Sequence, residues 1–302
     1  MDGSLGGLAG DSGSEYSREW SFWKSWIVSL TFCVVWFAVT SIVIILLFVV
    51  LAMMGFSESF SMHLSISFSY LIAISLTLLF MNFEGQLSGL SDKLSIDSSK
   101  QALILLLGIP VLVTIVDFIV VMGYGIGYEL AFGIPELSTD IGVEWGSGPV
   151  ALGLVVISTV IIAPIAEELM FRGYLLDSIK KLHGDWIAVA ISAMIFGLVH
   201  LEPYTVGMAA IGGLIYGYVR IRTGSLWPSI IGHMMWNGVA LVVTYLKCRS
   251  DRPSLATPEA PGAVPHHCGS CGCAHAYGIY HIIAPQDPQY SSLFELSRCM
   301  LH

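Results

Sequence analysis

Charged residues are scarce in this sequence, and their scarcity excludes a soluble globule. Of the 302 residues only 12% are charged, whereas 55% are hydrophobic. A soluble domain carries about 25% charged residues, so this chain has too little polar surface to face water on all sides. The composition therefore indicates that lipid is the solvent for most of the chain, and membrane lipid is its first expected partner.

A basic surface and a cleavable leader are also missing. The formal net charge is −9, and no cluster or stripe of Lys and Arg occurs. Nucleic-acid-binding surfaces require such a stripe, so we expect no nucleic-acid partner. Residues 1–25 lack the basic start and small-residue cleavage site of a signal peptide. We interpret them as a polar N-terminal tail that precedes a retained membrane anchor.

Long hydrophobic runs are abundant, and they predict an all-α, polytopic transmembrane helical bundle. A helix that crosses the hydrocarbon core needs about 20 apolar residues. The expected spans are 26–54, 62–82, 102–125, 149–176, 186–202, 204–221 and 226–246, which makes about seven spans. Only the letters "LEPY" separate the fifth and sixth, so these two should form a tight antiparallel hairpin.

The spans divide the chain into five parts. Three leading transmembrane spans (26–125) follow the tail at 1–25, and an acidic exterior loop (126–148) separates them from a four-helix block (149–246). We expect this block to be catalytic, for the reasons given below. A C-terminal tail that contains Cys and His (247–302) follows it.

The distribution of Lys and Arg predicts the orientation of the spans. Basic residues occur in the N-terminal tail, the 83–101 loop, the 177–185 turn and the end of the sixth span, and none occurs at 55–61 or 126–148. Cytoplasmic loops carry the excess of Lys and Arg, so the N-terminus is expected in the cytoplasm. We expect an integral protein of the plasma membrane, or of the endoplasmic reticulum in a eukaryote.

Three charged residues interrupt the fourth span, in the stretch "PIAEELMFRGY" at 164–174. A charged side chain at the centre of a membrane helix costs about 2.5–3.5 kcal/mol, so such residues usually carry function. Glu168 and Arg172 lie four residues apart and can pair. Glu167 points about 100° away and stays free of that pair. Pro164 removes a backbone hydrogen bond and should bend the helix here.

Two further motifs supply polar groups at a similar depth. "FGLVH" ends at His200, and "HMMWN" runs from His233 to Asn237. Measured at about 1.5 Å per helical residue from the nearest turns, Glu167, His200, His233 and Asn237 lie at similar levels. The spacing therefore permits one intramembrane site built from three helices.

The three motifs together resemble the signature motifs of the CPBP family. E-E-x-x-x-R occurs as "EELMFR", F-x-x-x-H as "FGLVH" and H-x-x-x-N as "HMMWN", in that order within residues 149–246. The family contains CAAX prenyl endopeptidases and intramembrane proteases of the bacteriocin-processing or immunity type. The resemblance implies that Glu168 and Arg172 hold the architecture of the site.

The resemblance also implies peptide-bond hydrolysis inside the membrane. Glu167 with His200 would activate water as the general base, and His233 with Asn237 would stabilise the oxyanion. The substrate would be a membrane-anchored, hydrophobic or lipidated peptide, of which prenylated C-terminal CAAX peptides are one class. Burial can bring a carboxyl pKa near neutrality, as general-base catalysis needs.

The sequence leaves the use of a metal open. Glu167, His200 and His233 could form a zinc set with one carboxylate and two histidines, and zinc is the cofactor to expect if a metal takes part. The usual zinc-protease motif H-E-x-x-H is absent. Catalysis by glutamate alone and catalysis by a metalloprotease both remain possible from the sequence.

Other interpretations stay open beside the protease. The same polar residues could form a structural network in a catalytically silent membrane scaffold or immunity protein. Glu167 and Asp117, the acid in "VTIVDFIVV", could instead relay protons in a transporter, although a structural hydrogen bond is the simpler role for Asp117. In the tail, "HHCGSCGCAH" at 266–275 could bind zinc or form disulfides, although a disordered or incidental segment is the simpler interpretation. The ending "CMLH" has the C-a-a-X shape with Cys299 as its cysteine, but His is an unusual last residue for prenylation.

Overall fold

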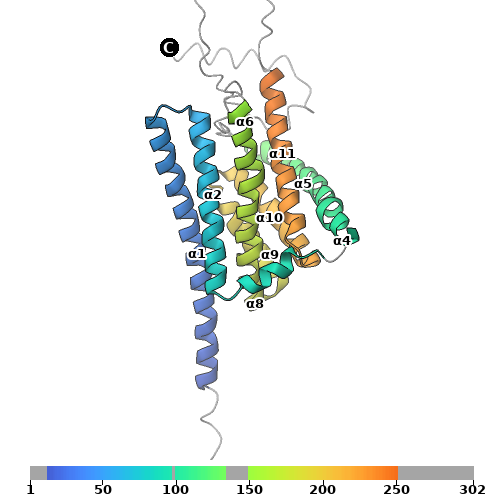
Figure 1. The fold of residues 1–302 in the computed structure, drawn as a ribbon. Coiled ribbons are helices and arrows are strands. Elements are labelled where there is room, and N and C mark those ends of the chain that lie inside the picture. Colours follow the sequence, from blue (N-terminus) through green and yellow to red (C-terminus); the bar gives the residue numbers. More distant parts are fainter. Residues whose placement is uncertain (1–11, 97–98, 134–148, 251–302) are drawn as a thin grey trace, which may run out of the picture.

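The computed structural model describes residues 12–96, 99–133 and 149–250, and these residues form a helical bundle without strands (Figure 1). The predicted all-α membrane fold is confirmed. Five helices are long and apolar enough to cross a membrane: Trp26–Met53, Glu58–Phe83, Gln101–Phe132, Pro149–His183 and Trp227–Leu246. Residues 266–275, Cys299 and most of the predicted acidic loop lie outside the described ranges.

The first two helices form an antiparallel pair along one side of the bundle (Figure 1). α1 (Ser12–Met53) rises from the N-terminal end, and α2 (Glu58–Phe83) returns beside it. Trp36 of α1 donates its indole hydrogen toward the Ala73 carbonyl and the Thr77 hydroxyl of α2, at 3.2 and 3.1 Å. This polar clamp inside an apolar interface fixes how α2 faces the rest of the bundle.

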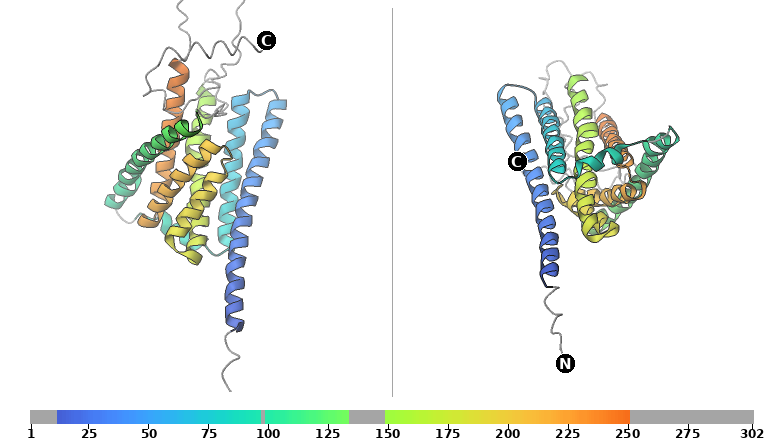
Figure 2. Two further views of the ribbon diagram at one scale, coloured as in Figure 1. Left: turned by 180° about the vertical axis from the view of Figure 1, so that it is seen from behind. Right: turned by 60° about the horizontal axis from the view of Figure 1, so that its bottom comes forward.

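The third span lies on the opposite side of the bundle (Figure 2). It consists of α4 (Ser99–Leu103), the π-helical turn η2 (Ile104–Gly108) and α5 (Ile109–Phe132). α5 packs against α10 (Pro203–Thr223) and α11 (Trp227–Ser250). This contact joins the leading spans to the four-helix block.

The fourth span contains two π-helical stretches, and they expose backbone carbonyls to the interior. It runs through α6 (Pro149–Val155), η3 (Val156–Ile162), α7 (Ala163–Glu168), η4 (Leu169–Leu175) and α8 (Leu176–His183). Pro164 stands at the start of α7, where its missing N–H interrupts the hydrogen-bond ladder. Side chains from other helices donate to the Thr159 and Phe171 carbonyls. Such π-helical turns occur frequently at functional sites.

The predicted hairpin is present but shorter than two full spans. It consists of α9 (Asp185–Leu198) and α10, and α9 has 14 residues. At 1.5 Å per residue α9 is about 21 Å long, whereas the hydrocarbon core is about 30 Å thick. Figure 2 shows the turn between them below the upper ends of α2 and α11. The span predicted at 186–202 is thus the short helix α9, and the one predicted at 204–221 is α10, which has 21 residues; neither is among the five long apolar helices.

Small residues allow the two helices of this hairpin to touch. A Cβ atom added at Gly213 would lie 2.8 Å from the Ala193 Cα, and one added at Gly197 would lie 2.7 Å from the Val206 carbonyl oxygen. Glu202 ends the turn by capping α10, because its carboxylate accepts from the backbone N–H groups of Tyr204 and Thr205. The two helices of the hairpin thus pack closely against each other.

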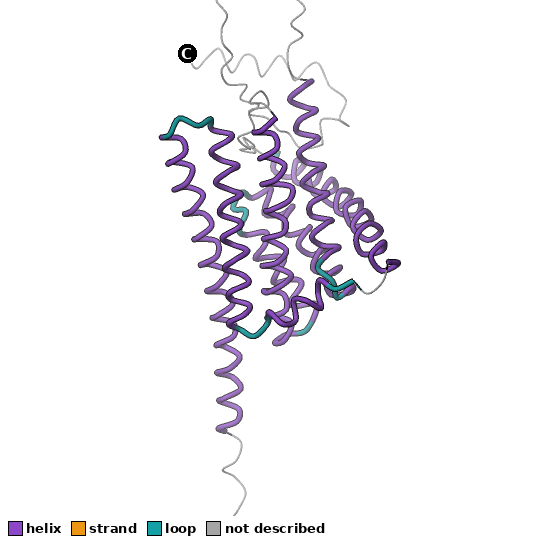
Figure 3. Tube along the Cα trace, viewed as in Figure 1, coloured by secondary structure: helices purple, strands orange, loops and turns teal. Residues whose placement is uncertain are grey.

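The connections alternate between the two ends of the bundle, as Figure 3 shows. The residues linking α2 to α4, α8 to α9 and α10 to α11 share the end at which α1 begins, and we call this end the basic end because the interior Lys and Arg residues gather there. The α1–α2 and α9–α10 connections lie toward the opposite end. The alternation matches the loop pattern expected from the Lys and Arg distribution.

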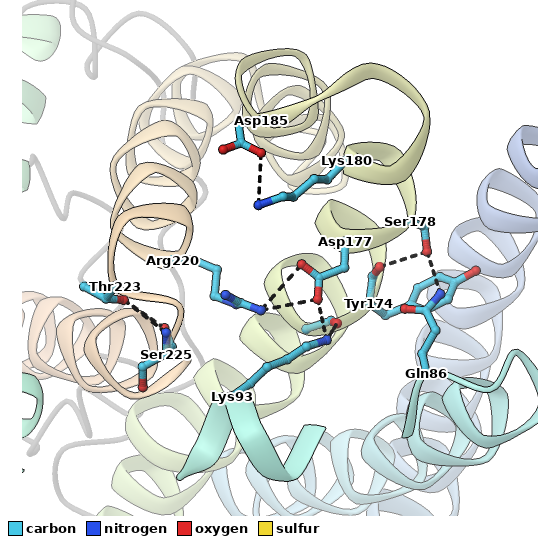
Figure 4. Close-up of polar contacts among 11 residues, drawn as sticks. Gln86, Lys93, Tyr174, Asp177, Ser178, Lys180, Asp185, Arg220, Thr223 and Ser225 are labelled. Atoms are coloured by element: carbon cyan, nitrogen blue, oxygen red, sulfur yellow. Dashed lines mark hydrogen bonds and ion pairs between the residues drawn. The ribbon is translucent and has the colours of Figure 1, made fainter. Parts of the chain in front are cut away.

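A short helix closes the basic end. α3 (Leu90–Leu94) follows the turn η1 (Leu87–Gly89), and its Lys93 contacts Asp177 of α8, which also pairs with Arg220 of α10 at 3.3 Å (Figure 4). The Lys93 ammonium also donates to the Gly173 carbonyl at 3.0 Å. The Leu226 N–H donates to the Lys93 carbonyl, and the Trp227 indole donates to the Leu94 carbonyl. α3 therefore ties three helices together directly below η4.

Removal of the Asp177 carboxylate should weaken the attachment of α3 to the bundle. We expect Asp177→Asn to lower the melting temperature of the purified protein, because Lys93 and Arg220 have side chains only 14% and 9% exposed and would lose their counter-charge. The matched control is Lys180→Ala, which removes one half of the Lys180–Asp185 pair seen in Figure 4. That pair is 44% and 45% exposed, so its loss should change the melting temperature little. Equal shifts in the two variants would contradict the closure.

Candidate active site

A buried ion pair lies at the centre of the fourth span, as the four-residue spacing predicts. Arg172 Nη1 donates to Glu168 Oε1 at 2.9 Å, and both side chains are fully buried. The Arg172 guanidinium carbon lies 4.4 Å from the centroid of the Phe196 ring and 5.8 Å from that of Tyr216. Aromatic faces thus replace water around the cation. The pair is locked in place.

Glu167, the neighbouring acid, has a different environment. Its side chain is 14% exposed, and its Oε1 accepts a hydrogen bond from the Tyr70 hydroxyl at 2.7 Å. Its other oxygen, Oε2, lies 3.9 Å from His233 Nε2. Apart from His233, no cation or backbone donor contacts Glu167 among the residues that the structure describes, so this carboxylate can reach a reacting molecule.

His233 stands between the two glutamates. Its Nδ1 lies 3.1 Å from Glu168 Oε1, and its Nε2 faces Glu167. Because Glu168 Oε1 already accepts from Arg172, we assign the hydrogen of this contact to His233 Nδ1. The imidazole stacks on the Tyr216 ring with centroids 5.6 Å apart and an interplanar angle of 17°. The ring is therefore oriented by an anion at one edge and an aromatic face below.

Asn237 lies one helical turn beyond His233 on α11. Its side-chain nitrogen donates to the Thr159 carbonyl at 2.8 Å, in the π-helical stretch η3. An amide nitrogen carries two hydrogens, so one remains for another acceptor. The widened turn of η3 thus supplies the carbonyl that orients this amide.

His200 lies just beyond the end of α9. α9 ends at Leu198, and His200 follows in the turn, where its Nδ1 lies 2.8 Å from the Phe196 carbonyl oxygen. A carbonyl only accepts, so Nδ1 carries the hydrogen and Nε2 is the acceptor in the neutral ring. Among the described residues no hydrogen bond joins His200 to Glu167, and the joint activation of water by these two residues stays a prediction.

Phe196 connects the two imidazoles. Its ring centroid lies 5.1 Å from that of His200 and 5.9 Å from that of His233, both nearly edge to face. The motif "FGLVH" contains this phenylalanine, but the sequence indicated no role for it. In the structure its ring packs against both imidazoles and covers the Arg172 guanidinium.

Sequence reasoning missed Tyr70 completely. A signal was available, because Ser59, His63, Ser67 and Tyr70 are spaced so that they share one face of α2, and this polar face is unusual in an apolar span. The structure packs that face against the fourth span, where His63 Nδ1 lies 2.9 Å from the Ser158 hydroxyl. A test of helical periodicity for polar residues would have found Tyr70.

The zinc set considered from the sequence does not fit this geometry. Within the described residues, no group of three or more His, Cys, Asp or Glu side chains is arranged to hold a metal ion. Of Glu167, His200 and His233, only the first and last approach each other. The chemistry derived below therefore uses the side chains of the chain alone.

Comparison with known families finds a match in the block that carries this site. Residues 149–239, less than a third of the chain, match the family described as "Type II CAAX prenyl endopeptidase Rce1-like". The match supports the resemblance to the CPBP family. The matched residues include Glu167, His200, His233 and Asn237, whereas Tyr70 lies outside them.

Two curated relatives are similar over part of the chain. The Bacillus subtilis (strain 168) protein YdiL, named as a candidate membrane peptidase, is 28% identical over 111 residues, which are 35% of this chain and 46% of YdiL. An uncharacterised 24.3 kDa protein of Escherichia coli is 28% identical over 132 residues, 42% of this chain and 60% of that protein. The chain thus spans about half the length of these relatives. No solved structure matches it.

Proposed function

We propose that the chain is a membrane-embedded endopeptidase that hydrolyses a peptide bond of a membrane-anchored or C-terminal substrate. The observation that supports this most strongly is the contrast between two adjacent acids. Glu168 is fully buried and held by Arg172 and His233, whereas Glu167 is 14% exposed, accepts from the Tyr70 hydroxyl and lies 3.9 Å from His233. One carboxylate is structural, and its neighbour is available for chemistry.

In the first step Glu167 acts as the general base. Its carboxylate takes a proton from a water molecule as the water oxygen bonds to the scissile carbonyl carbon. The Tyr70 hydroxyl, at 2.7 Å, holds the carboxylate in one orientation. His200 lines the far side of Phe196 with an accepting Nε2, and we assign it to orient the water or the substrate there.

The negative charge that forms on the carbonyl oxygen needs hydrogen-bond donors. His233, protonated on Nε2, and the second amide hydrogen of Asn237 are the available donors on this side of the site. Glu168 stabilises the imidazolium through Nδ1. When the C–N bond breaks, the amine leaves with the proton held by Glu167, and the carboxylate is restored.

The closure by α3 suggests how substrate reaches the site. Lys93, Leu226 and Trp227 seal the bundle directly below Gly173, so the basic end offers no direct route. We place that end in the cytoplasm, on the basis of the Lys and Arg distribution. A substrate held in lipid by a hydrophobic or prenyl group would approach laterally. This favours lipidated peptides over free ones.

The test is cleavage by the purified full-length chain in lipid nanodiscs. A quenched fluorescent peptide with a farnesylated C-a-a-X end is compared with the same peptide without the farnesyl group. We expect cleavage of the farnesylated peptide, and ¹⁸O from labelled water in the new carboxyl terminus. Cleavage that stops with a metal chelator and returns with zinc would contradict the metal-free mechanism. Binding of the peptide without any cleavage would instead support the silent scaffold.

A substitution at Tyr70 tests whether a residue outside the matched block takes part in the reaction. Tyr70→Phe removes the hydroxyl that holds Glu167 and preserves the ring. We expect kcat for the farnesylated peptide to fall about tenfold with KM nearly unchanged, because a base is less well oriented but substrate contacts remain. Tyr128→Phe, at the far end of α5, is the matched control and should keep wild-type kcat. An unchanged kcat in Tyr70→Phe would remove Tyr70 from the mechanism.

A further inference from the structure

Asp117 is a buried acid that neither the family match nor the proposed mechanism uses. It lies in the middle of α5, is 2% exposed, and stands outside residues 149–239. One of its oxygens accepts from the Tyr216 hydroxyl at 2.8 Å, and the other, Oδ1, has no hydrogen-bond partner among the described residues. Burial of a carboxyl group in a membrane with one oxygen lacking a hydrogen bond costs free energy, and such groups usually have a function.

Tyr216 connects this acid to the site. Its hydroxyl end is held by Asp117, and the face of its ring lies against His233, with an interplanar angle of 17°. Tyr216 is itself buried, and the Arg172 guanidinium carbon lies 5.8 Å from its ring centroid. Any movement of the Tyr216 ring would therefore change the surface on which His233 rests.

Two glycines lie next to the Tyr216 ring. A Cβ atom added at Gly212 would lie 3.5 Å from Tyr216 Cε2, and one added at Gly232 would lie 3.4 Å from Tyr216 Cε1. The Thr114 hydroxyl, one turn before Asp117 on α5, contacts the Gly232 carbonyl at 3.3 Å. One face of α5 thus holds α10 through Asp117 and α11 through Thr114, next to His233.

We propose that Asp117 is a positioning residue for the hydrolysis. By accepting from Tyr216 it fixes the plane of that ring and, through it, the plane of the His233 imidazole between Glu168 and Glu167. The inference rests on the proposed function and extends the site to a helix of the leading spans. A hydrogen-bond donor stabilises the developing oxyanion from about 2.7–3.1 Å, and an error of about 0.5 Å in its position weakens the contact. The orientation of His233 therefore affects the rate.

A purely structural hydrogen bond is the competing explanation, and it makes a different prediction. A polar contact between membrane helices contributes little to stability on average, so the loss of a purely structural one changes stability slightly and leaves the site unaffected. A positioning role changes kcat with little change in KM. It also requires that Asp117 and Tyr216 act as one unit.

The kinetic test uses the full-length chain in nanodiscs with the farnesylated peptide. Asp117→Leu removes the acceptor, and Tyr216→Phe removes the donor; each should lower kcat about tenfold and leave KM within about twofold. The double variant should be no slower than either single one, because both remove the same contact. Asp117→Asn keeps an accepting oxygen and should retain kcat within about threefold of wild type.

A second measurement does not depend on cleavage. Ethoxyformylation of His233 by diethyl pyrocarbonate is followed by mass spectrometry of the peptide that contains it. We expect the rate to rise severalfold in Asp117→Leu and Tyr216→Phe, where the ring is freed, and to stay at the wild-type value in Asp117→Asn. Tyr174→Phe is the matched control, since it removes the buried contact of Tyr174 with Ser29 at 3.2 Å without touching His233.

The outcomes separate the two proposals. If the wild-type chain cleaves no peptide, the proposed function fails, and the labelling rate of His233 alone decides whether Asp117 positions that ring. If Asp117→Leu lowers only the melting temperature and leaves both kcat and the His233 rate unchanged, the positioning role is overturned. Additive kcat losses in the double variant would also overturn it, because Asp117 would then act by another path.

Discussion

Glu167→Gln is expected to lower kcat for peptide cleavage by about 10³-fold, within the range of 10²–10⁴ typical of a lost general base. Glutamine has nearly the same shape and still offers a carbonyl oxygen to the Tyr70 hydroxyl, but its amide cannot take a proton from water. The side chain is partly exposed, so the protein should fold and melt as the wild type does. Single-turnover cleavage of the farnesylated peptide measures the loss directly.

The control for this experiment is Glu84→Gln. Glu84 is an exposed glutamate just beyond the end of α2, so its conversion should leave kcat at the wild-type value. Retention of more than a tenth of the wild-type kcat by Glu167→Gln would show that another group is the base. His200, with its accepting Nε2, would then be the first residue to replace.

The features that could be predicted from the sequence are those set by local physics. A run of apolar residues must cross or enter the membrane, so the positions of the helices followed from length and hydropathy. The Glu168–Arg172 pair followed from a spacing of four residues, and the freedom of Glu167 followed from the same helix geometry. The shared depth of Glu167 and His233 followed from the rise per residue.

The features that could not be predicted depend on where a helix ends and what packs beside it. The depth calculation treated His200 as part of a straight helix, but α9 ends at Leu198, and beyond that point the rise per residue no longer sets the direction of a side chain. Tyr70 contacts Glu167 and Asp117 contacts Tyr216 from helices of the leading spans, and no periodicity within 149–246 contains them. Long-range packing determines these two contacts.

Arg172→Met is expected to lower the stability of the protein strongly. The substitution preserves an unbranched side chain between Phe196 and Tyr216 but leaves Glu168 buried without its cation. Removal of one partner of a buried pair costs about 3–5 kcal/mol, because the remaining charge is uncompensated. We expect a marked fall in the melting temperature and in the yield of folded protein from the membrane. Thermal denaturation monitored by tryptophan fluorescence measures the change.

The double variant Glu168→Met/Arg172→Met distinguishes the unpaired charge from lost packing. Replacement of both partners of a buried pair by apolar residues of similar size is often neutral or stabilising, so the double variant should regain most of the melting temperature lost by Arg172→Met. It should nevertheless stay inactive, because His233 Nδ1 loses the carboxylate that orients it and stabilises its charge. A double variant as unstable as Arg172→Met would assign the loss to the contacts of the guanidinium with the two rings. Recovery of both stability and cleavage would show that the ion pair has no part in the chemistry, and Glu167 would then act without an oriented imidazole.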